Sequence, residues 1–167
     1  MGTVDVNSET STENPGAGGV EMRLEVVVVP VSDVDRAKGF YQALGWRLDA
    51  DFASGEDFRV VQLTPPGSAC SISIGKGLTE AIPGSLQGMQ ICVGDIDAAH
   101  VQLIDRGVDV SPIRHVGEAG WADGKGGDFN SFIFFKDPDG NGWAIQESPL
   151  LRAPAGKSAV ASKAGAG

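Results

Sequence analysis

The sequence has few histidines and cysteines, with two of each among 167 residues. Cys70 and Cys92 both lie in apolar, strand-like runs, so we expect two buried free thiols rather than a disulfide or a metal pair. Free thiols are typical of a reducing compartment, and the N-terminus lacks the basic and then apolar order of a secretory signal. We therefore predict a cytoplasmic protein.

Long hydrophobic runs and positive charge are also scarce. No apolar run approaches the roughly eighteen residues that a membrane span needs, so we expect no membrane partner. Acidic residues outnumber basic ones by 22 to 13, which gives a net charge of -9 that is spread along the chain. Such a charge repels phosphate backbones and argues against nucleic acid as a partner, whereas it would attract a cationic ligand.

The two ends of the chain lack bulky apolar residues. Residues 1–21 are rich in Ser, Thr, Gly and acidic residues, and residues 152–167 are mostly small. Neither segment can bury enough apolar surface to offset the entropy of ordering, so we predict a disordered N-terminal tail and a flexible C-terminal tail. The folded part is then one domain over residues 22–151, a size that suits a single core.

The middle of the chain contains an internal repeat. Residues 31–49 match residues 93–111 at a constant offset of 62, and the turns "TPPGS" and "DPDGN" also correspond. This period is too long for a solenoid unit. We therefore predict two modules in one domain, residues 22–86 and residues 87–151.

Each module shows the same order of elements. A β-branched run at 24–31 predicts a strand, and an apolar stripe that ends at Gly45 predicts a helix, for which Ser32 and Asp35 resemble a capping box. Three short strands follow. In the second module "MQICV", "VDVSP", "SFIFFKD" and "NGWAIQE" are the expected strands. The fold class is therefore α+β, a βαβββ unit that occurs twice.

This duplicated unit, with "PVSDVDRAKGFYQALGW" in the first module and "DPDGNGWAIQE" closing the second, resembles the vicinal oxygen chelate superfamily. That superfamily includes glyoxalase I, bleomycin and fosfomycin resistance proteins and extradiol dioxygenases. The resemblance implies a curled mixed sheet in each module, a cavity between the two half-barrels and a homodimer. It also implies a site where a divalent metal commonly binds neighbouring oxygens of a substrate.

The positions where the superfamily carries its metal ligands are occupied by poor donors. By the resemblance these positions are Val26, Ser71, Gly88 and Ala144. A divalent ion needs three or four histidine, carboxylate or thiolate donors, so we predict no metal cofactor. Glu147 is the carboxylate that the motif would suggest as a ligand, and strand alternation turns it away from the face of Ala144 unless a bulge reverses the parity.

The same alternation predicts the lining of the cavity. An apolar chamber with a few neutral hydrogen-bonding groups suits an uncharged or aromatic organic ligand. The alternative is that these small residues let the half-barrels pack together without a void. The residues expected to point inward are Val26, Val28, Ser71, Ser73, Gly88, Gln90, Ala144 and Gln146.

Residues 113–131 carry five glycines and no regular periodicity, which predicts a long loop. If this loop folds over the cavity mouth, Trp121 and Phe129 would contact a ligand. His115 is the candidate for acid–base chemistry because its ordinary pKa lies near neutrality. An exposed histidine without chemistry, and a Trp121 that only anchors the loop, are equally compatible with the sequence.

Three functions remain open. The first is a dimeric, metal-independent protein of the bleomycin-resistance kind that binds a small neutral, aromatic or cationic molecule. The second is a cofactor-independent isomerase or lyase that acts on a carbonyl compound through His115. The third is a glyoxalase-like or dioxygenase-like enzyme with one divalent metal ion, which would need Glu147 and His115 to turn inward together.

Overall fold

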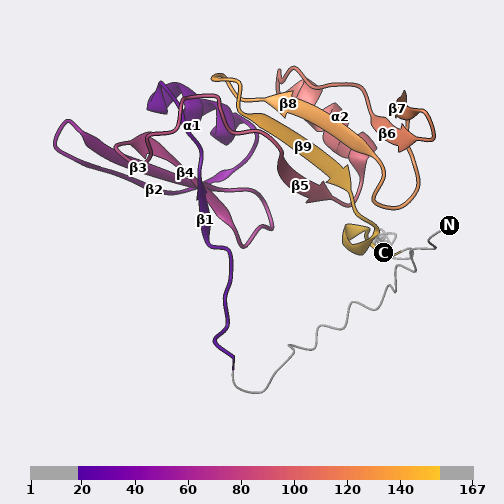
Figure 1. Ribbon diagram of the computed structural model, residues 1–167, viewed down its shortest axis with the longest axis horizontal. Helices are drawn as coiled ribbons and strands as arrows, with labels where there is room; N and C mark the ends of the chain where they lie inside the picture. The colour runs from indigo at the N-terminus through magenta and orange to yellow at the C-terminus, as the bar shows by residue number, and fades with distance from the viewer. Residues whose placement is uncertain (1–18, 155–167) are drawn as a thin grey trace, which may run out of the picture.

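A computed structural model describes residues 19–154 of the chain, which form two β-sheets with one helix each (Figure 1). The first module contains β1 (Val26–Val28), α1 (Val34–Ala43), β2 (Arg47–Ser54), β3 (Phe58–Thr64) and β4 (Ser71–Lys76). The second contains β5 (Met89–Val93), α2 (Ile96–Asp105), β6 (Arg114–Gly117), β7 (Gly120–Asp123), β8 (Phe132–Lys136), β9 (Gly142–Glu147) and a 3-10 turn, η1 (Pro149–Leu151).

Both sheets are mixed, and their strand orders correspond except that the second sheet has β7 as an additional edge strand. The first sheet runs β1-β4-β3-β2 and the second β5-β9-β8-β6-β7. One pair in each sheet is parallel. In the first sheet β1 pairs with β4, with Val26 opposite Ser71, and in the second β5 pairs with β9, with Gln90 opposite Ala144. The remaining pairs are antiparallel. The predicted α+β fold with two related modules is therefore confirmed.

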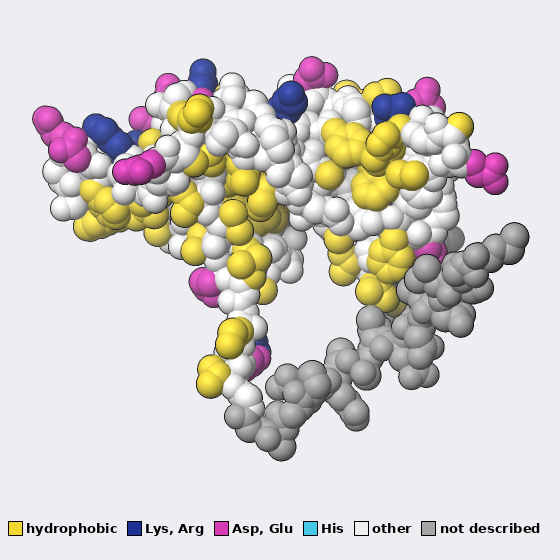
Figure 2. Space-filling model, viewed as in Figure 1, with side chains coloured by type: hydrophobic (Ala, Val, Ile, Leu, Met, Phe, Trp, Pro, Cys, Tyr) yellow, Lys and Arg dark blue, Asp and Glu magenta, His cyan; other side chains and the backbone are white. Residues whose placement is uncertain are grey.

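Residues 19–25 precede β1 as an extended segment that stands away from both sheets (Figure 1 and Figure 2). Residues 1–18 and 155–167, on which most of the two predicted tails fall, lie outside the described residues. Within 19–154 no helix is long and apolar enough to cross a membrane.

The two helices begin in the same way, as the repeat implies. Asp33 is the N-cap of α1 and its carboxylate accepts a hydrogen bond from the Arg36 backbone N–H, while Asp95 does the same for Ala98 at the start of α2. The predicted capping role of Ser32 is wrong. Ser32 instead donates its hydroxyl and its backbone N–H to Asp139 in the other module.

Each sheet buries one face against its helix. On the helix side lie Val61, Leu63, Ile72 and Ile74 in the first module, and Ile133, Phe135, Trp143 and Ile145 in the second. The alternate residues of the same strands point to the other side, which we call the open face of each sheet.

The two modules are joined by buried aromatic rings. Tyr41 and Trp46 lie close together in the first module, with ring centroids 4.9 Å apart. Trp143 of β9 packs edge-on against Trp46 at 5.3 Å and lies 6.0 Å from Tyr41. Edge-to-face pairs of this kind add about 0.5–1.5 kcal/mol each beyond the burial of their area.

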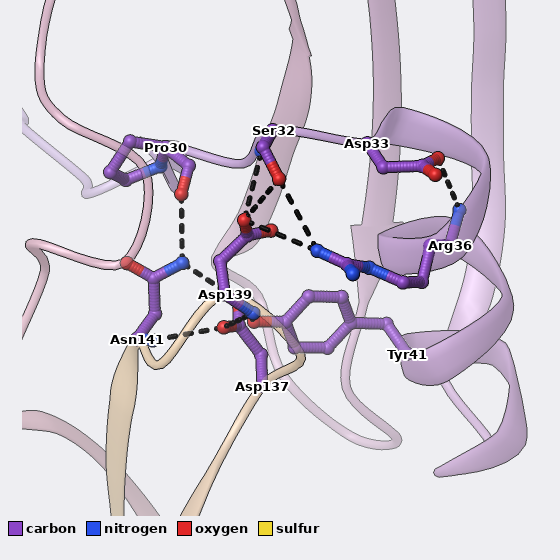
Figure 3. Close-up of polar contacts among 8 residues, drawn as sticks. All are labelled: Pro30, Ser32, Asp33, Arg36, Tyr41, Asp137, Asp139 and Asn141. Carbon is purple, nitrogen blue, oxygen red and sulfur yellow. Dashed lines mark hydrogen bonds and ion pairs between the residues drawn. The ribbon is translucent and has the colours of Figure 1, made fainter.

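A polar network reinforces this contact at the "DPDGN" turn (Figure 3). The buried Asp137 carboxylate accepts hydrogen bonds from the Tyr41 hydroxyl at 2.8 Å and the Asn141 side chain at 2.7 Å. Asn141 also donates to the Pro30 carbonyl at 2.8 Å. Burial first, and then the Asp137 charge, raise the pKa of the Tyr41 phenol far above its ordinary value. Asp137 and Asn141, which the sequence predicts as turn formers, thus also form hydrogen bonds between the two modules.

Two predictions for the second module are corrected. Residues 113–131 are not an irregular loop throughout, because they contain the β6–β7 hairpin. The expected strand "VDVSP" is reduced to one isolated pair, Val110 with Phe135, and regular pairing begins only at Arg114.

The cysteines also differ from expectation. Both are free, as predicted, but Cys92 is exposed on β5 and Cys70 is only half-buried. Cys92 lies on the open face of β5, which is the edge strand of the second sheet.

Candidate functional site

The open face of the second sheet carries a group of three aromatic side chains, Trp121, Phe132 and Phe134, which we call the aromatic cluster. Trp121 of β7 packs edge-on against Phe132 and Phe134 of β8, with centroid distances of 5.5 and 5.4 Å. The two phenylalanine rings are nearly parallel at 6.3 Å. Trp121 is 48% exposed although it packs on two rings. Its outer surface is therefore available to a ligand.

A cavity of about 680 Å³ adjoins this cluster at Phe134. Its volume lies within the usual range of sites for small organic molecules. Gly88 and Ala144 open its floor because they lack bulky side chains, and the exposed Asp109 and Lys136 place one negative and one positive group at its rim. The other lining residues are Gln87, Val110, Ser111, Pro112, Phe135, Gly142 and Trp143.

A chain of amide hydrogen bonds lies on the same open face. Gln90 of β5 donates to the side-chain oxygen of Gln146 at 2.7 Å, and Gln146 donates to the Phe129 carbonyl at 2.6 Å. Phe129 has a φ of 57°, which is unusual for a bulky residue. Strained backbone of this kind tends to occur at functional sites. The hydrogen bond from Gln146 to the Phe129 carbonyl therefore holds the segment before β8 against the open face of the sheet.

The segment that carries Trp121 and Phe129 is tied down at several points. Asn130 accepts a hydrogen bond from the Val116 N–H at 2.9 Å and donates to the Val116 carbonyl at 3.0 Å. Lys125 reaches across to Asp97 of α2 at 2.8 Å and to Glu147 of β9 at 3.1 Å. These contacts hold the β6–β7 hairpin at a fixed position beside β8.

His115 lies on the other side of this hairpin from Trp121. Val116 pairs with Trp121, so alternation places His115, which pairs with Ala122, on the opposite side. Its Nδ1 lies 3.0 Å from the Gly124 carbonyl oxygen. The predicted catalytic residue therefore does not share a face with the aromatic cluster.

Glu147 lies on the helix side of β9 and is buried. Its carboxylate accepts a hydrogen bond from the Ile96 N–H, in the first turn of α2, at 3.0 Å. Lys125 and Arg152 form ion pairs with it at 3.1 and 2.9 Å. The Ile96 hydrogen bond, followed by these two cations, holds the pKa of Glu147 below its usual range. The residue stabilises the start of α2 and does not face the cavity.

The residues predicted to line a single chamber are divided in the structure. Gly88 and Ala144 line the cavity beside the aromatic cluster, whereas Ser71 and Gln90 line a second crevice of about 360 Å³ between the modules. Both cysteines lie along that crevice. On the first sheet, Val26 and Val28 are exposed, and Ser71 and Ser73, their β4 partners, are buried.

The two phenylalanines of the cluster were missed by the sequence analysis. Phe132 pairs with Gln146 and Phe134 with Ala144, so they occupy the face already predicted for those two residues. The alternation of "FIFF" places Phe132 and Phe134 on one face of the strand. Which face of the sheet this is becomes known only from the pairing between β8 and β9.

Residues 19–154 contain no group of three His, Cys, Asp or Glu side chains placed to hold a metal ion. The open face near the aromatic cluster offers instead aromatic rings, amides and small side chains. Groups of this kind form van der Waals contacts and neutral hydrogen bonds with organic molecules.

The chain is similar to known proteins over most of its described length. The sequence profile of the Glyoxalase/Bleomycin resistance protein/Dioxygenase superfamily matches residues 23–145. TnmS3, an antibiotic binding protein from Streptomyces sp. CB03234, is 30% identical with a TM-score of 0.63, and the match covers 78% of this chain and 98% of TnmS3.

Two further solved structures show the same similarity. A glyoxalase/bleomycin resistance protein from the same Streptomyces is 32% identical with a TM-score of 0.59, over 74% of this chain and 99% of that one. A superfamily member from Sphaerobacter thermophilus is 26% identical with a TM-score of 0.61, over 77% and 98%. Among curated proteins, none is detectably similar to this chain.

Proposed function

Because the chain belongs to the Glyoxalase/Bleomycin resistance protein/Dioxygenase superfamily, we propose that it binds a small aromatic molecule on the open face of its second sheet, without a metal. The observation that carries this proposal is the aromatic cluster beside a cavity of about 680 Å³. The name of TnmS3 as an antibiotic binding protein supports the same class of function.

The chemistry of the site supports a ligand held by stacking and hydrogen bonds. The exposed surface of Trp121 provides a flat contact whose ring face is electron-rich, and this suits planar or cationic aromatic molecules. Gln90 and Gln146 supply neutral donors and acceptors. Asp109 provides a negative group at the rim, and the net charge of -9 favours cationic ligands from a distance.

Metal-free binding is supported by what occupies the superfamily's ligand positions. The side chains of Val26 and Ala144 carry no metal-donor atoms and Gly88 has no side chain, while Ser71 shares its hydroxyl in hydrogen bonds with Thr64 and Gln62. Glu147 is engaged by the first turn of α2 and by two cations.

We also propose that the protein acts as a homodimer in the cytoplasm. The free thiols of Cys70 and Cys92 support a reducing compartment. Exposed apolar side chains on both open faces, such as Phe52 and Phe58 on the first sheet and Val116 on the second, support self-association.

A ligand screen by thermal unfolding tests the function. The probes are doxorubicin, a planar cationic aromatic antibiotic, and bleomycin, each measured with EDTA and then with Ni, Mn, Zn or Fe(II). We expect at least one probe to raise the Tm equally under all these conditions. A Tm increase that requires a metal would favour the metal enzyme, and turnover of a carbonyl compound that is lost in His115→Ala would favour the isomerase or lyase.

A further inference from the structure

Arg114 of β6 brings a positive charge to the open face that carries the aromatic cluster. Its partner on β8 is Phe132, and its partner on β7 is Asp123. Residues directly opposite each other on neighbouring antiparallel strands point to the same side of the sheet, so Arg114 shares the open face with Phe132. Trp121, two residues before Asp123 on β7, lies on this face as well. The guanidinium therefore belongs to the same surface as the three rings.

The hydrogen-bonding capacity of this guanidinium is mostly unused. An arginine side chain has five N–H donors. In the part of the chain that the structure describes, Arg114 donates one side-chain hydrogen bond, from Nη2 to the Trp121 carbonyl at 3.5 Å, which is long for such a bond. Its Nε is buried and has no hydrogen-bond acceptor among residues 19–154. The Asp123 Oδ1 atom lies 3.4 Å from Nε, which is within ion-pair distance.

An unpaired N–H on a charged group is unfavourable when it is buried, and such groups in folded proteins call for an explanation. Asp123 satisfies Arg114 poorly, because its side chain is 86% exposed and pairs that are open to water are weak. The Arg114 side chain is itself 39% exposed, so an anion from solvent can reach it. Nε and Nη2 form one edge of the guanidinium, and a carboxylate can bind such an edge with both of its oxygens.

The neighbours of Arg114 determine which kind of anion fits best. The Trp121 side chain is 48% exposed, and its backbone carbonyl is the group that Nη2 contacts. A ring that stacks on this indole therefore brings a directly attached acid group next to the guanidinium. The net charge of -9 does not prevent this contact, because fields from distant exposed charges are screened beyond about 8 Å at physiological ionic strength.

We propose that Arg114 determines the specificity of this site by binding the carboxylate of a planar aromatic acid. The proposal rests on the function proposed above and names the class of its ligand. The rings of the acid contact Trp121, the carboxylate accepts hydrogen bonds from Nε and Nη2 of Arg114, and the Asp123 side chain moves into solvent.

Calorimetric titration with 2-naphthoate and 2-naphthamide at pH 7 tests this proposal. The two probes have the same rings, and only 2-naphthoate is ionised at this pH. We expect the wild type to bind 2-naphthoate at least about tenfold more tightly than 2-naphthamide, because hydrogen bonds to a charged acceptor are stronger than those to a neutral one. Arg114→Gln should abolish this preference. Its affinity for 2-naphthamide should stay within about threefold of the wild type, which also shows that the variant is folded.

Lys136→Gln is the matched control for the lost positive charge. Lys136 lies at the rim of the cavity, and its replacement removes the same charge as Arg114→Gln. We expect this variant to keep the preference for 2-naphthoate within about threefold of the wild type. Loss of the preference in Lys136→Gln and not in Arg114→Gln would overturn the proposal.

Asp123→Asn distinguishes a ligand contact from a purely structural role of Arg114. The variant removes the anion that competes for the guanidinium, so it should bind 2-naphthoate at least about threefold more tightly and 2-naphthamide as the wild type does. Asp109→Asn, which removes the same charge at the rim of the cavity, should show less than about half of this gain. An Arg114 that only supports the hairpin would give equal affinities for 2-naphthoate in the wild type and in Asp123→Asn.

The two probes also separate failure of this proposal from failure of the proposed function. Equal affinities of the wild type for both probes, or a preference that persists in Arg114→Gln, would overturn the role of Arg114 and leave the aromatic site intact. If neither probe binds at millimolar concentration, the function proposed for the aromatic cluster fails, and the role of Arg114 fails with it.

Discussion

The Tyr41 hydroxyl is the point where the two modules share a buried hydrogen bond network. It donates to Asp137 at 2.8 Å and accepts from the Trp143 indole N–H at 3.1 Å. The Asp137 carboxylate also accepts hydrogen bonds from the backbone N–H groups of Asp139 and Asn141. Both oxygens of this buried carboxylate therefore have hydrogen-bond donors. Burial without these donors would be costly, so the network is a strong determinant of how the modules sit together.

Replacing this hydroxyl should destabilise the whole domain. We expect Tyr41→Phe to lower the free energy of unfolding by about 1–3 kcal/mol, because the Asp137 carboxylate and the Trp143 N–H each lose a buried partner. Urea unfolding at pH 7 measures the change. Ser68→Ala is the control, since it removes an exposed hydroxyl bound only to the nearby Cys70 carbonyl and N–H. A Tyr41→Phe protein as stable as the control would contradict this role of the network.

At this scale the sequence conveyed the local role of a residue but not its distant partner. Asp137 and Asn141 were predicted to form a turn, and they do so, with the Asn141 N–H bound to Asp137. Their contacts with Tyr41 and Pro30 join positions about a hundred residues apart in the chain. Nothing in a turn motif indicates which buried hydroxyl lies opposite it.

At the scale of elements, the start of α2 depends on Glu147. Its folded pKa lies below the ordinary carboxyl value, so its contribution to stability is fully present above the ordinary value and is lost as the pH falls from there through the folded pKa. Asp51, whose pKa is lowered mainly by Arg59, adds a similar loss on the acidic side. A variant at position 147 is therefore needed to isolate the contribution of Glu147.

We expect Glu147→Gln to lower the free energy of unfolding at pH 7 by about 1–2 kcal/mol, because the Ile96 N–H and the cations of Lys125 and Arg152 lose a charged acceptor. The difference from wild type should shrink as the pH is lowered through the carboxyl range. Urea unfolding at several values between pH 7 and pH 3 measures it. A difference that stays constant over this range would show that the charge of Glu147 contributes nothing.

The segment between β7 and β8 offers a matched pair of glycines. A Cβ at Gly126 would lie 2.2 Å from the Asn130 carbonyl oxygen, whereas a Cβ at Gly127 would meet nothing within 4 Å. We expect Gly126→Ala to displace the segment and cost about 1–3 kcal/mol of unfolding free energy, with weaker binding of any aromatic ligand. Gly127→Ala should leave both unchanged. Thermal unfolding and ligand titration of the pair measure this, and equal behaviour would contradict a fixed segment.

The elements were predictable where the pattern was long and periodic. The repeat placed Asp33 and Asp95 at equivalent helix starts, and the alternation of "NGWAIQE" separated Ala144 from Glu147. The β6–β7 hairpin was missed because its strands have four residues each and glycines dominate their surroundings. Its side chains are ordered by contacts with β8 and β9, which a local pattern does not contain.

At the scale of the molecule, the two modules present two open faces rather than one closed chamber. The aromatic cluster lies on one face, and the exposed Val26, Val28, Phe52 and Phe58 lie on or at the edge of the other sheet. The sequence assigned Ser71, Gln90 and Ala144 to one chamber, and it could not show that the cavity beside Phe134 and the crevice beside Ser71 are separate. That division depends on the angle between the modules, which the contacts of Tyr41 and Asp137 determine.

The central claim is that the aromatic cluster binds an organic molecule without a metal, and isothermal calorimetry of doxorubicin binding tests it most directly. Wild-type protein, Trp121→Ala and the control Ile82→Ala, which truncates an exposed apolar side chain outside the aromatic cluster, would each be titrated with and without EDTA. We predict that EDTA changes no affinity and that only Trp121→Ala weakens binding, by about tenfold or more. Binding that EDTA abolishes, or that is the same in Trp121→Ala as in wild type, would contradict the account.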